Sequence, residues 1–323
     1  MKRRTLAAGL AAALLPAGRS RAQGTAAPPA GRPIQMIVAY PPGGGTDIAA
    51  RTLAMFMERE LGQPVVVLNR AGAGGEIGFG ELARSRPDGT TIGFLNTPNI
   101  VTMPIERRTS YRLDDIAPIA NIVDDPGGFF VLNDSPHRTL ADLVTYAKAN
   151  PEKVTYATTG IGSDDHLAGL AFSRAAGIQM THVPYNGASQ TRNALLTRQV
   201  TLGSINVSEG LPDVQQGTAR ALGQMATSRW EGLPEVPTFR EQGFDVIQSS
   251  MRGVGAPAGT PPALLNRYAE ALQRIVANPE FRRMATQQAL PLRYLGPDEY
   301  RTELNTLRTE FEKLWAQHPW REG

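Results

Sequence analysis

The chain is 323 residues long, has a formal net charge of +3 and contains no cysteine. A core of the size that this length allows needs no disulfides, so the sequence excludes a small scaffold held together by cross-links. Basic residues are not clustered in the body of the chain, where Arg107-Arg108 and Arg282-Arg283 are isolated pairs. The charge pattern therefore argues against a nucleic-acid partner.

The N-terminus has the three parts of an export signal. Basic residues at positions 2–4 precede an apolar run over residues 5–15, which is shorter than the roughly 20 residues that span a membrane. Ser20-Arg21-Ala22 then places small residues where a signal peptidase cleaves. We expect residues 1–22 to be a signal peptide removed after Ala22, residues 23–32 a flexible lead-in, and the mature protein to be periplasmic.

Loss of this signal peptide reverses the sign of the net charge. Residues 1–22 hold five Lys and Arg and no acid, so the formal net charge changes from +3 to −2.

Arg3-Arg4 matches part of a twin-arginine signal, and the choice between the two bacterial export routes stays open. No second apolar stretch approaches membrane-spanning length, so no membrane insertion of the mature chain is expected.

Strands and helices alternate from residue 34 onward. A β-rich apolar run ends in a turn of proline and glycine, and Thr46 and Asp47 can cap the helix that follows. Later strands also end in turns that open helices. The predicted strands are 34–40, 65–69, 91–95, 128–132, 154–158, 181–183, 202–206 and 219–226; the predicted helices are 46–61, 76–85, 139–149, 163–176, one after 187, 262–277, 279–288 and 297–316.

This alternation predicts an α/β protein with parallel, doubly wound sheets. Because the pattern restarts in mid-chain and ends in a helical third, we expect two lobes with a cleft between them, the second inserted into the first. The chain is expected to cross between lobes near Asp125 and near Thr227. The first lobe is then discontinuous, over residues 33–125 plus 227–323, and the second covers residues 126–226.

Two glycine-rich turns form the candidate binding site. Gly43-Gly44-Gly45-Thr46 and Gly160-Ile161-Gly162-Ser163 each follow a predicted strand and open a helix. Open α/β sheets bind ligands at the carboxyl ends of their strands, and the free N–H groups of a first helical turn favour an anion. One such turn by itself is more typical of an ordinary connection, but one on each lobe predicts a two-sided carboxylate site.

Nucleotide binding, hydrolysis and metal binding have less support in the sequence. Residues 72–78 match a relaxed dinucleotide-binding pattern, but only Asp88, in a Pro-Asp-Gly turn, stands where a ribose-binding acid is needed. Ser163 and His166 allow a hydrolase interpretation, although the acids between them are typical of helix capping. No two histidines have helical metal-ligand spacing. We therefore expect no cofactor, no metal and no catalytic residue.

A series of motifs resembles the Bug family, the extracytoplasmic receptors of tripartite tricarboxylate transporters. The resemblance extends from about residue 33 to 315, in the family's order, and implies a periplasmic-binding-protein-like (type II) fold. The motifs are YPPGGGTDIAAR (40–51), NRAGAGG (69–75), PDG (87–89), TTGIGS (158–163), HLAG (166–169), HVPYNG (182–187), LPEVPT (233–238) and APAGTP (256–261).

The resemblance implies a monomer that binds a small carboxylate between its lobes and delivers it to the membrane subunits of a transporter. Family ligands include amino acids, di- and tricarboxylates and aromatic acids. The turns after the first strand and around 159–163 would meet the carboxylate, with His166 as a neighbour. The implied ligand-binding residues are Tyr40, Pro42, Gly43, Gly44, Gly45, Thr46, Asp47, Thr159, Gly160, Gly162, Ser163, His166, Tyr185 and Gly187.

One segment departs from the family pattern. Ser250-Met251-Arg252-Gly253 stands where the family often has Ser-Trp-Tyr-Gly, so a thioether and a fixed cation replace an aromatic wall. Arg252 either binds a second carboxylate or shapes a more polar pocket, or else it points to solvent. Two alternative functions stay open: a sensor that presents its bound form to a signalling partner, and a periplasmic hydrolase using Ser163 and His166.

Overall fold

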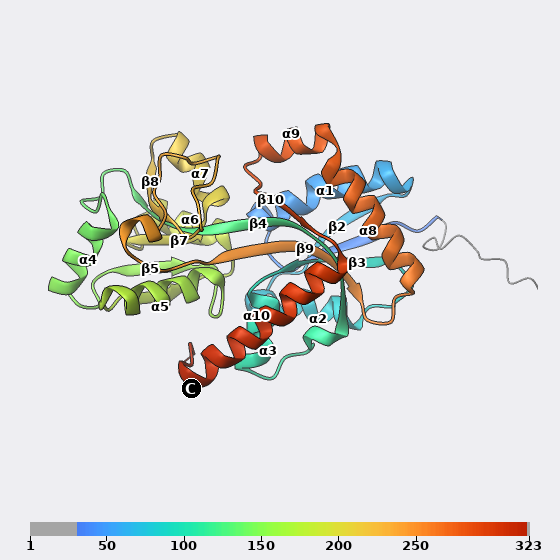
Figure 1. Ribbon diagram of the computed structural model, residues 1–323, viewed down its shortest axis with the longest axis horizontal. Coiled ribbons are helices and arrows are strands. Elements are labelled where there is room, and N and C mark those ends of the chain that lie inside the picture. The colour runs from blue at the N-terminus through green and yellow to red at the C-terminus, as the bar shows by residue number, and fades with distance from the viewer. Residues whose placement is uncertain (1–30, 322–323) are drawn as a thin grey trace, which may run out of the picture.

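The computed structural model describes residues 31–321. Two lobes of helices and strands lie side by side along the long axis of the molecule, and strands run from one lobe into the other (Figure 1). The predicted signal peptide, residues 1–22, and nearly all of the predicted lead-in, residues 23–32, lie outside the described residues. In the described part, no helix combines the length and the apolar character needed to cross a membrane.

One ten-stranded sheet runs through both lobes in the order β2-β1-β3-β9-β4-β7-β5-β6, and β10 and β8 also pair with β4. The strands are β1 (Ile34–Val38), β2 (Val65–Asn69), β3 (Thr91–Asn96), β4 (Ile116–Leu132), β5 (Thr155–Thr158), β6 (Thr181–Pro184), β7 (Leu202–Asn206), β8 (Ala219–Gln224), β9 (Ser249–Pro257) and β10 (Leu292–Leu295). The helices are α1 (Gly45–Leu61), α2 (Glu76–Arg84), α3 (Asn99–Glu106), α4 (Leu140–Ala149), α5 (Asp164–Ala176), α6 (Ala188–Leu196), α7 (Val207–Gln215), α8 (Pro262–Ala277), α9 (Pro279–Gln287) and α10 (Pro297–Gln317).

The first lobe is built around the parallel strands β2, β1 and β3. The apolar residues of β1 and β3 are mostly buried, and they pack under helices from both ends of the chain. Met36 of β1 and Ile92 of β3 share one core cluster with Phe56 of α1 and with Tyr268 and Leu272 of α8. Burial of this apolar surface is the main force that joins the two chain segments.

The second lobe is built around β5, which pairs in parallel with β6 and β7. Its core centres on aromatic rings. The ring of Phe129 in β4 lies 5.2 Å from that of Phe172 in α5 and 5.1 Å from that of Phe239, both in edge-to-face geometry. Edge-to-face contacts of this kind add to the stability gained from burial alone.

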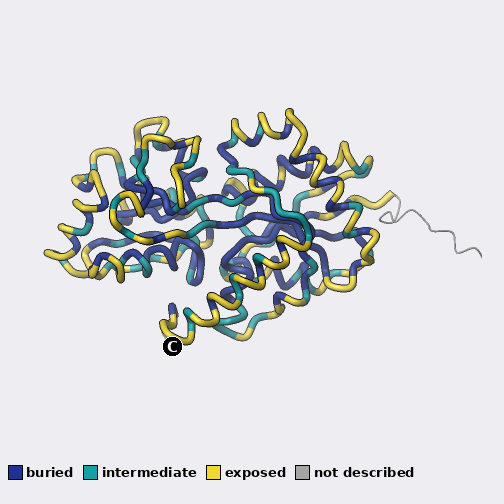
Figure 2. Tube along the Cα trace, viewed as in Figure 1, coloured by how far each residue is buried: buried dark blue, intermediate teal, exposed yellow. Residues whose placement is uncertain are grey.

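Strands β4 and β9 connect the two lobes. β4 is 17 residues long; it pairs with β9 from Ile116 to Pro126 and with β7 and β8 from Gly127 onward. Both strands are mostly buried along their course between the lobes (Figure 2). The predicted α/β class and the two-lobed arrangement are confirmed.

Several elements are absent from the sequence prediction. The sequence does not predict β9 (Ser249–Pro257), because its glycines and its arginine break any alternation of apolar and polar residues. The prediction also omits β10 and places only the end of β4. Helices α3 and α7 each contain a proline, Pro104 and Pro212, a residue that usually ends a helix. Tertiary packing holds these elements in place against their weak local propensities.

The segment between β8 and β9 packs on the second lobe. Phe239 and Val246 belong to the same buried cluster as Phe129 and Phe172. The crossing expected near Thr227 would assign this segment to the first lobe. Because its apolar side chains complete the core of the second lobe, we propose that the second crossing lies at the start of β9.

Replacing Phe239 by alanine tests this boundary. Because the ring is fully buried, we expect Phe239→Ala to lower the free energy of unfolding by about 3–5 kcal/mol, measured by urea denaturation. The exposed Tyr146 gives the control, since Tyr146→Ala should change stability far less. A loss for Phe239→Ala no larger than that of the control would show that the segment does not complete the second core.

Candidate functional site

A cavity lies between the lobes, where the carboxyl ends of β1, β3, β5, β6 and β7 meet β9. It contains about 480 Å³ of space not filled by atoms, part of it open to solvent. Strand ends of this kind are the usual ligand site of open α/β sheets. The lining residues are Tyr40, Pro41, Gly44, Gly45, Thr46, Asn96, Asn99, Thr159, Asp164, Gly187, Ala188, Ser189, Gln190, Asn206, Glu209, Ser250 and Arg252.

The turn after β1 presents the N-terminus of α1 to this cavity. A Cβ atom at Gly45 would lie 2.5 Å from Arg252 Nη1 and 2.8 Å from Glu209 Oε1, so glycine allows a close approach here that other residues prevent. The Gly45 N–H donates to Glu209 Oε1 at 3.1 Å. Asn96 Nδ2 donates to Thr46 Oγ1 at 2.6 Å. One N–H group of α1 is therefore already bonded to a carboxylate of the second lobe.

The N-terminus of α6 presents free donors to the same cavity. Gly187 caps this helix with a φ of 129°, which favours glycine. Among residues 31–321, no acceptor bonds to the N–H of Ala188 or of Ser189. The Ser189 hydroxyl donates across the cleft to the Pro42 carbonyl at 3.4 Å. Because the first turn of α6 has no acid, its positive end is not compensated.

The second glycine turn is held mainly by its own side chains. Ser163 caps α5: its Oγ accepts from the His166 N–H at 3.2 Å and donates to the Gly160 carbonyl at 2.8 Å. The Gly162 N–H donates to His166 Nδ1 at 3.2 Å. From this turn only Thr159 lines the cavity. The polar groups of Ser163 and His166 stabilise the loop rather than face a ligand.

This geometry does not favour the hydrolase interpretation. Within the described residues, no hydrogen bond joins the Ser163 hydroxyl to the His166 ring. Burial lowers the pKa of His166 to about 3, far below the value that suits a general base at neutral pH. No group of three or more His, Cys, Asp or Glu between residues 31 and 321 is arranged to hold a metal ion.

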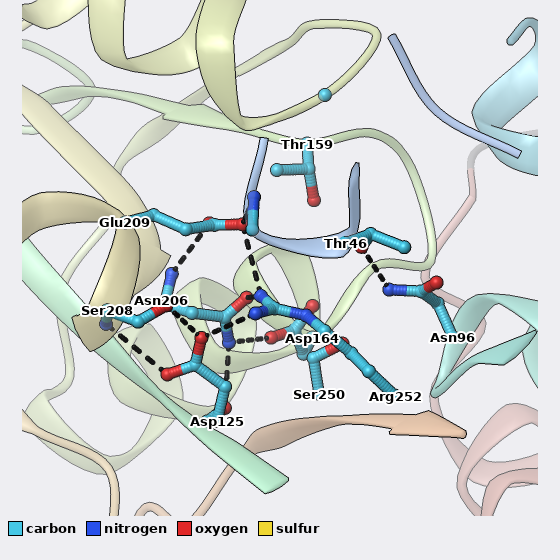
Figure 3. A network of polar contacts seen from close by, with 12 residues as sticks. Thr46, Asn96, Asp125, Thr159, Asp164, Asn206, Ser208, Glu209, Ser250 and Arg252 are labelled. Atoms are coloured by element: carbon cyan, nitrogen blue, oxygen red, sulfur yellow. Dashed lines mark hydrogen bonds and ion pairs between the residues drawn. The ribbon is translucent and has the colours of Figure 1, made fainter. Parts of the chain in front are cut away.

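Arg252 lies beneath the cavity and is only 1% exposed, so the solvent-facing alternative is wrong. Its Nη1 lies 2.8 Å from Asp125 Oδ2, and its Nη2 lies 3.0 Å from Glu209 Oε1 (Figure 3). The same Nη2 donates to Asn206 Oδ1 at 2.9 Å. Ser208 Oγ donates to Asp125. This buried guanidinium of β9 therefore links β4 to the N-terminus of α7.

Four carboxyl groups accompany this cation, and together they form what we call the acidic floor: Asp125, Asp164, Asp165, Glu209 and Arg252. Burial raises the pKa of Asp125 and of Asp164 to about 6. It raises the pKa of Asp165 well above 3.8 and also raises that of Glu209. The acidic floor therefore holds four carboxyl groups against a single guanidinium, and burial makes ionisation of those carboxyl groups more costly than in water.

The structure brings together about half of the predicted site residues. Asp47 instead accepts hydrogen bonds from Arg51, Asn69 and the Gly43 N–H, which fixes the turn. Those that line the cavity are Tyr40, Gly44, Gly45, Thr46, Thr159, Gly187 and Arg252; those that do not are Pro42, Gly43, Asp47, Gly160, Gly162, Ser163, His166 and Tyr185.

Polar residues at and just beyond the ends of β3 and β7 were not among the predicted site residues. Asn206 and Glu209 form a capping box at the start of α7, with Glu209 Oε2 accepting from the Asn206 N–H. The spacing of Asn-x-x-Glu at a strand end is a readable signal for this helix start. Asn96, at the end of β3, carries no comparable signal. The sequence indicates Asp164 only as a helix cap.

Removing the buried cation should lower the stability of the folded protein at neutral pH. Arg252→Met leaves Asp125 and Glu209 without their charge partner, so we expect the free energy of unfolding to fall by about 3–5 kcal/mol at pH 7. At pH 5 the loss should be smaller, because the unpaired buried acids then bind protons that the unfolded chain does not. Urea denaturation at both pH values measures this. The exposed Arg240, paired with Asp245, is the control, and an equally small loss for both variants would contradict the proposed role of Arg252.

The buried histidines predict a loss of stability in acid. The rings of His166 and His182 stack at 4.0 Å, and burial lowers their pKa to about 3 and about 4. The unfolded chain therefore binds protons below about pH 6.5 that the folded chain does not, which costs about 2 kcal/mol for His166 between pH 7 and 5. His166→Asn keeps an acceptor for the Gly162 N–H. In this variant the melting temperature should fall less between pH 7 and pH 5 than in the unmodified protein. His318→Asn, at an exposed site, should leave this fall unchanged; equal slopes in all three proteins would refute this account.

Comparison with known proteins identifies relatives of most of the chain. Residues 49–300 match the model of the tripartite tricarboxylate transporter family receptor, TctC. BugT of Bordetella pertussis (strain Tohama I) is 37% identical over 281 residues, which are 84% of this chain and 84% of BugT. The structure of the periplasmic binding protein BugD has a TM-score of 0.84 and 29% identity, covering 91% of this chain and 99% of BugD.

A further solved structure, R. palustris Rpa4515 with adipate, has a TM-score of 0.85 and 26% identity over 89% of this chain and 97% of that one. At this coverage, the structural matches to BugD and Rpa4515 include both lobes. They confirm the periplasmic-binding-protein-like fold and, together with the match to BugT, the resemblance to the Bug family. The chain belongs to the TctC family of tripartite tricarboxylate transporter receptors.

Proposed function

We propose that this protein is a periplasmic receptor that binds a small carboxylate between its lobes and delivers it to the membrane subunits of a tripartite transporter. Family membership supports the role of receptor, and the similarity to the structure of Rpa4515 with adipate supports the ligand class. The predicted signal peptide, residues 1–22, supports the location. The proposal includes no catalytic step.

The observation that carries this proposal is the N-terminus of α6, which has no side-chain cap hydrogen bond and no acid in its first turn. Ala188 and Ser189 line the cavity and present two N–H groups for which the described residues supply no acceptor. A carboxylate placed here accepts both hydrogen bonds and interacts favourably with the helix dipole. The Thr46 hydroxyl, on the first lobe, lines the same cavity and offers a further donor, whereas the Thr159 hydroxyl already donates to Asp165 Oδ2 at 2.6 Å.

Contacts across the cleft support a closed arrangement of the lobes. Gly45 of the first lobe donates to Glu209 of the second, and Thr102 Oγ1 donates to the Gly162 carbonyl at 2.8 Å. A ligand that bridges the two helix N-termini adds bonds to both lobes and so favours closure. The transporter would then meet a receptor whose shape depends on occupancy.

Replacing Ala188 by proline removes one donor while keeping the helix. Proline is well tolerated at the first position of a helix, which Ala188 occupies in α6, and it lacks an N–H group. Small organic acids, including adipate and 6-aminohexanoate, are first screened by thermal shift. Calorimetric titration of the best binder should then show about a tenfold or greater loss of affinity in Ala188→Pro.

Ala188→Ser is the matched control, because it keeps the N–H group and should retain near-normal affinity. Circular dichroism and the melting temperature verify that both variants fold. Unchanged affinity in a folded Ala188→Pro protein would remove the α6 N-terminus from the site. A screen in which no small carboxylate binds would refute the proposed function itself.

A further inference from the structure

The charges around the cavity are unevenly distributed. Among residues 31–321, the charged groups that line it are Asp164, Glu209 and Arg252, and Asp125 and Asp165 lie beside them in the acidic floor. Acidic groups therefore outnumber the single cation. A ligand that fills the cavity meets donors at the N-terminus of α6 and mainly acceptors at the acidic floor.

Arg252 already forms ion pairs with acids of the protein. Its Nη2 bonds to both Glu209 and Asn206, and its Nη1 lies 2.8 Å from Asp125 Oδ2. Neither Nη1 nor Nε has a hydrogen-bond partner in the described part of the chain. A ligand carboxylate brought to this guanidinium would approach the carboxylates of Asp125 and Glu209 that pair with it, and charges of like sign in a desolvated site repel strongly.

Asp164 forms no ion pair within residues 31–321, although the charge of nearby Arg252 lowers its pKa and so opposes the larger effect of burial. Asn206 Nδ2 donates to its Oδ2 at 2.7 Å, and the two ion pairs of Arg252 are made with other acids. Asp164 lines the cavity and is 4% exposed. A buried carboxylate of this kind is stabilised by a positively charged group within a few ångströms.

A second observation, on the first lobe, also indicates a ligand that donates hydrogen bonds. Asn96 lines the cavity from the end of β3 and is 4% exposed. Its Nδ2 donates to Thr46, and its Oδ1 has no donor among the described residues. Buried acceptors that lack a donor are rare in native structures, and a nitrogen group of the ligand would satisfy this one.

We propose that the ligand is a monocarboxylate whose other end carries a positively charged nitrogen group, and that Asp164 selects it over a dicarboxylate. This rests on the proposed function, in which the carboxylate binds at α6. The ammonium or amidinium end then faces the acidic floor, where it pairs with Asp164. Glu209 and Asp125 neutralise Arg252, so that the floor does not attract a second carboxylate.

Pairs of ligands with equal chain length test this selection. Succinate is compared with 4-aminobutanoate, glutarate with 5-aminopentanoate, and adipate with 6-aminohexanoate, by calorimetric titration at pH 7.5. The amino member of the pair that fits the cavity should bind at least tenfold more tightly. If the dicarboxylate binds as well or better in every pair, the inference is overturned while the proposed function stands. Binding of no member of any pair, nor of any acid in the thermal-shift screen, overturns both.

Two variants and one control test which residues select the ligand. Asp164→Asn keeps the size and an acceptor for Asn206, and should weaken the amino ligand at least tenfold while changing the dicarboxylate little. Glu209→Gln should strengthen the binding of adipate, because one carboxylate fewer then compensates the charge of Arg252. Asp298→Asn, at a 99% exposed side chain, is the control. Equal weakening of both ligand types in a folded Asp164→Asn protein would assign Asp164 a merely structural role and overturn the selection.

Discussion

The buried guanidinium of Arg252 is the interaction on which the arrangement of the cleft depends. It lies on β9, pairs with Asp125 of β4 and reaches Glu209 of α7. Taking these charges out of water costs several kcal/mol per ion unless each finds a partner. The strands that join the lobes and the helix that faces the cavity are therefore held in one relative position, because any other arrangement leaves a buried charge unpaired.

The glycine turns take their positions from this constraint. Gly45 must lack a side chain because the guanidinium and the Glu209 carboxylate occupy the space that a Cβ would need. The N-terminus of α1 is thereby brought against the second lobe, whereas no acid in the first turn compensates the positive end of α6. The chemistry of the site follows from which helix N-termini are already compensated: α5 and α7 begin with their own acids, Asp164 and Glu209, whereas α6 begins with none.

Much of the fold could be predicted from the sequence, because strands and helices alternate with clear turns and family motifs follow in order. β9 could not, since its residues are buried through pairing with β3 and β4, which are distant in sequence.

At the site, the turn at Gly44 and Gly45 was predictable from local pattern. The role of His166 was not, because whether a histidine faces a cavity or packs on another ring depends on tertiary contacts. Likewise, Arg252 stands out in the sequence as a departure from the family, but its partners Asp125 and Glu209 lie far away in the chain.

The hydrogen bond from Gly45 to Glu209 has a kinetic consequence. It joins the two lobes with a carboxylate that belongs to the protein itself, so the chain has an internal substitute for part of the contact that a ligand provides. A receptor that holds itself shut in this way must open before a solute enters. Its observed association rate should therefore level off at high solute concentration, at the rate of opening, and residence time and uptake would be governed by the breaking of this contact.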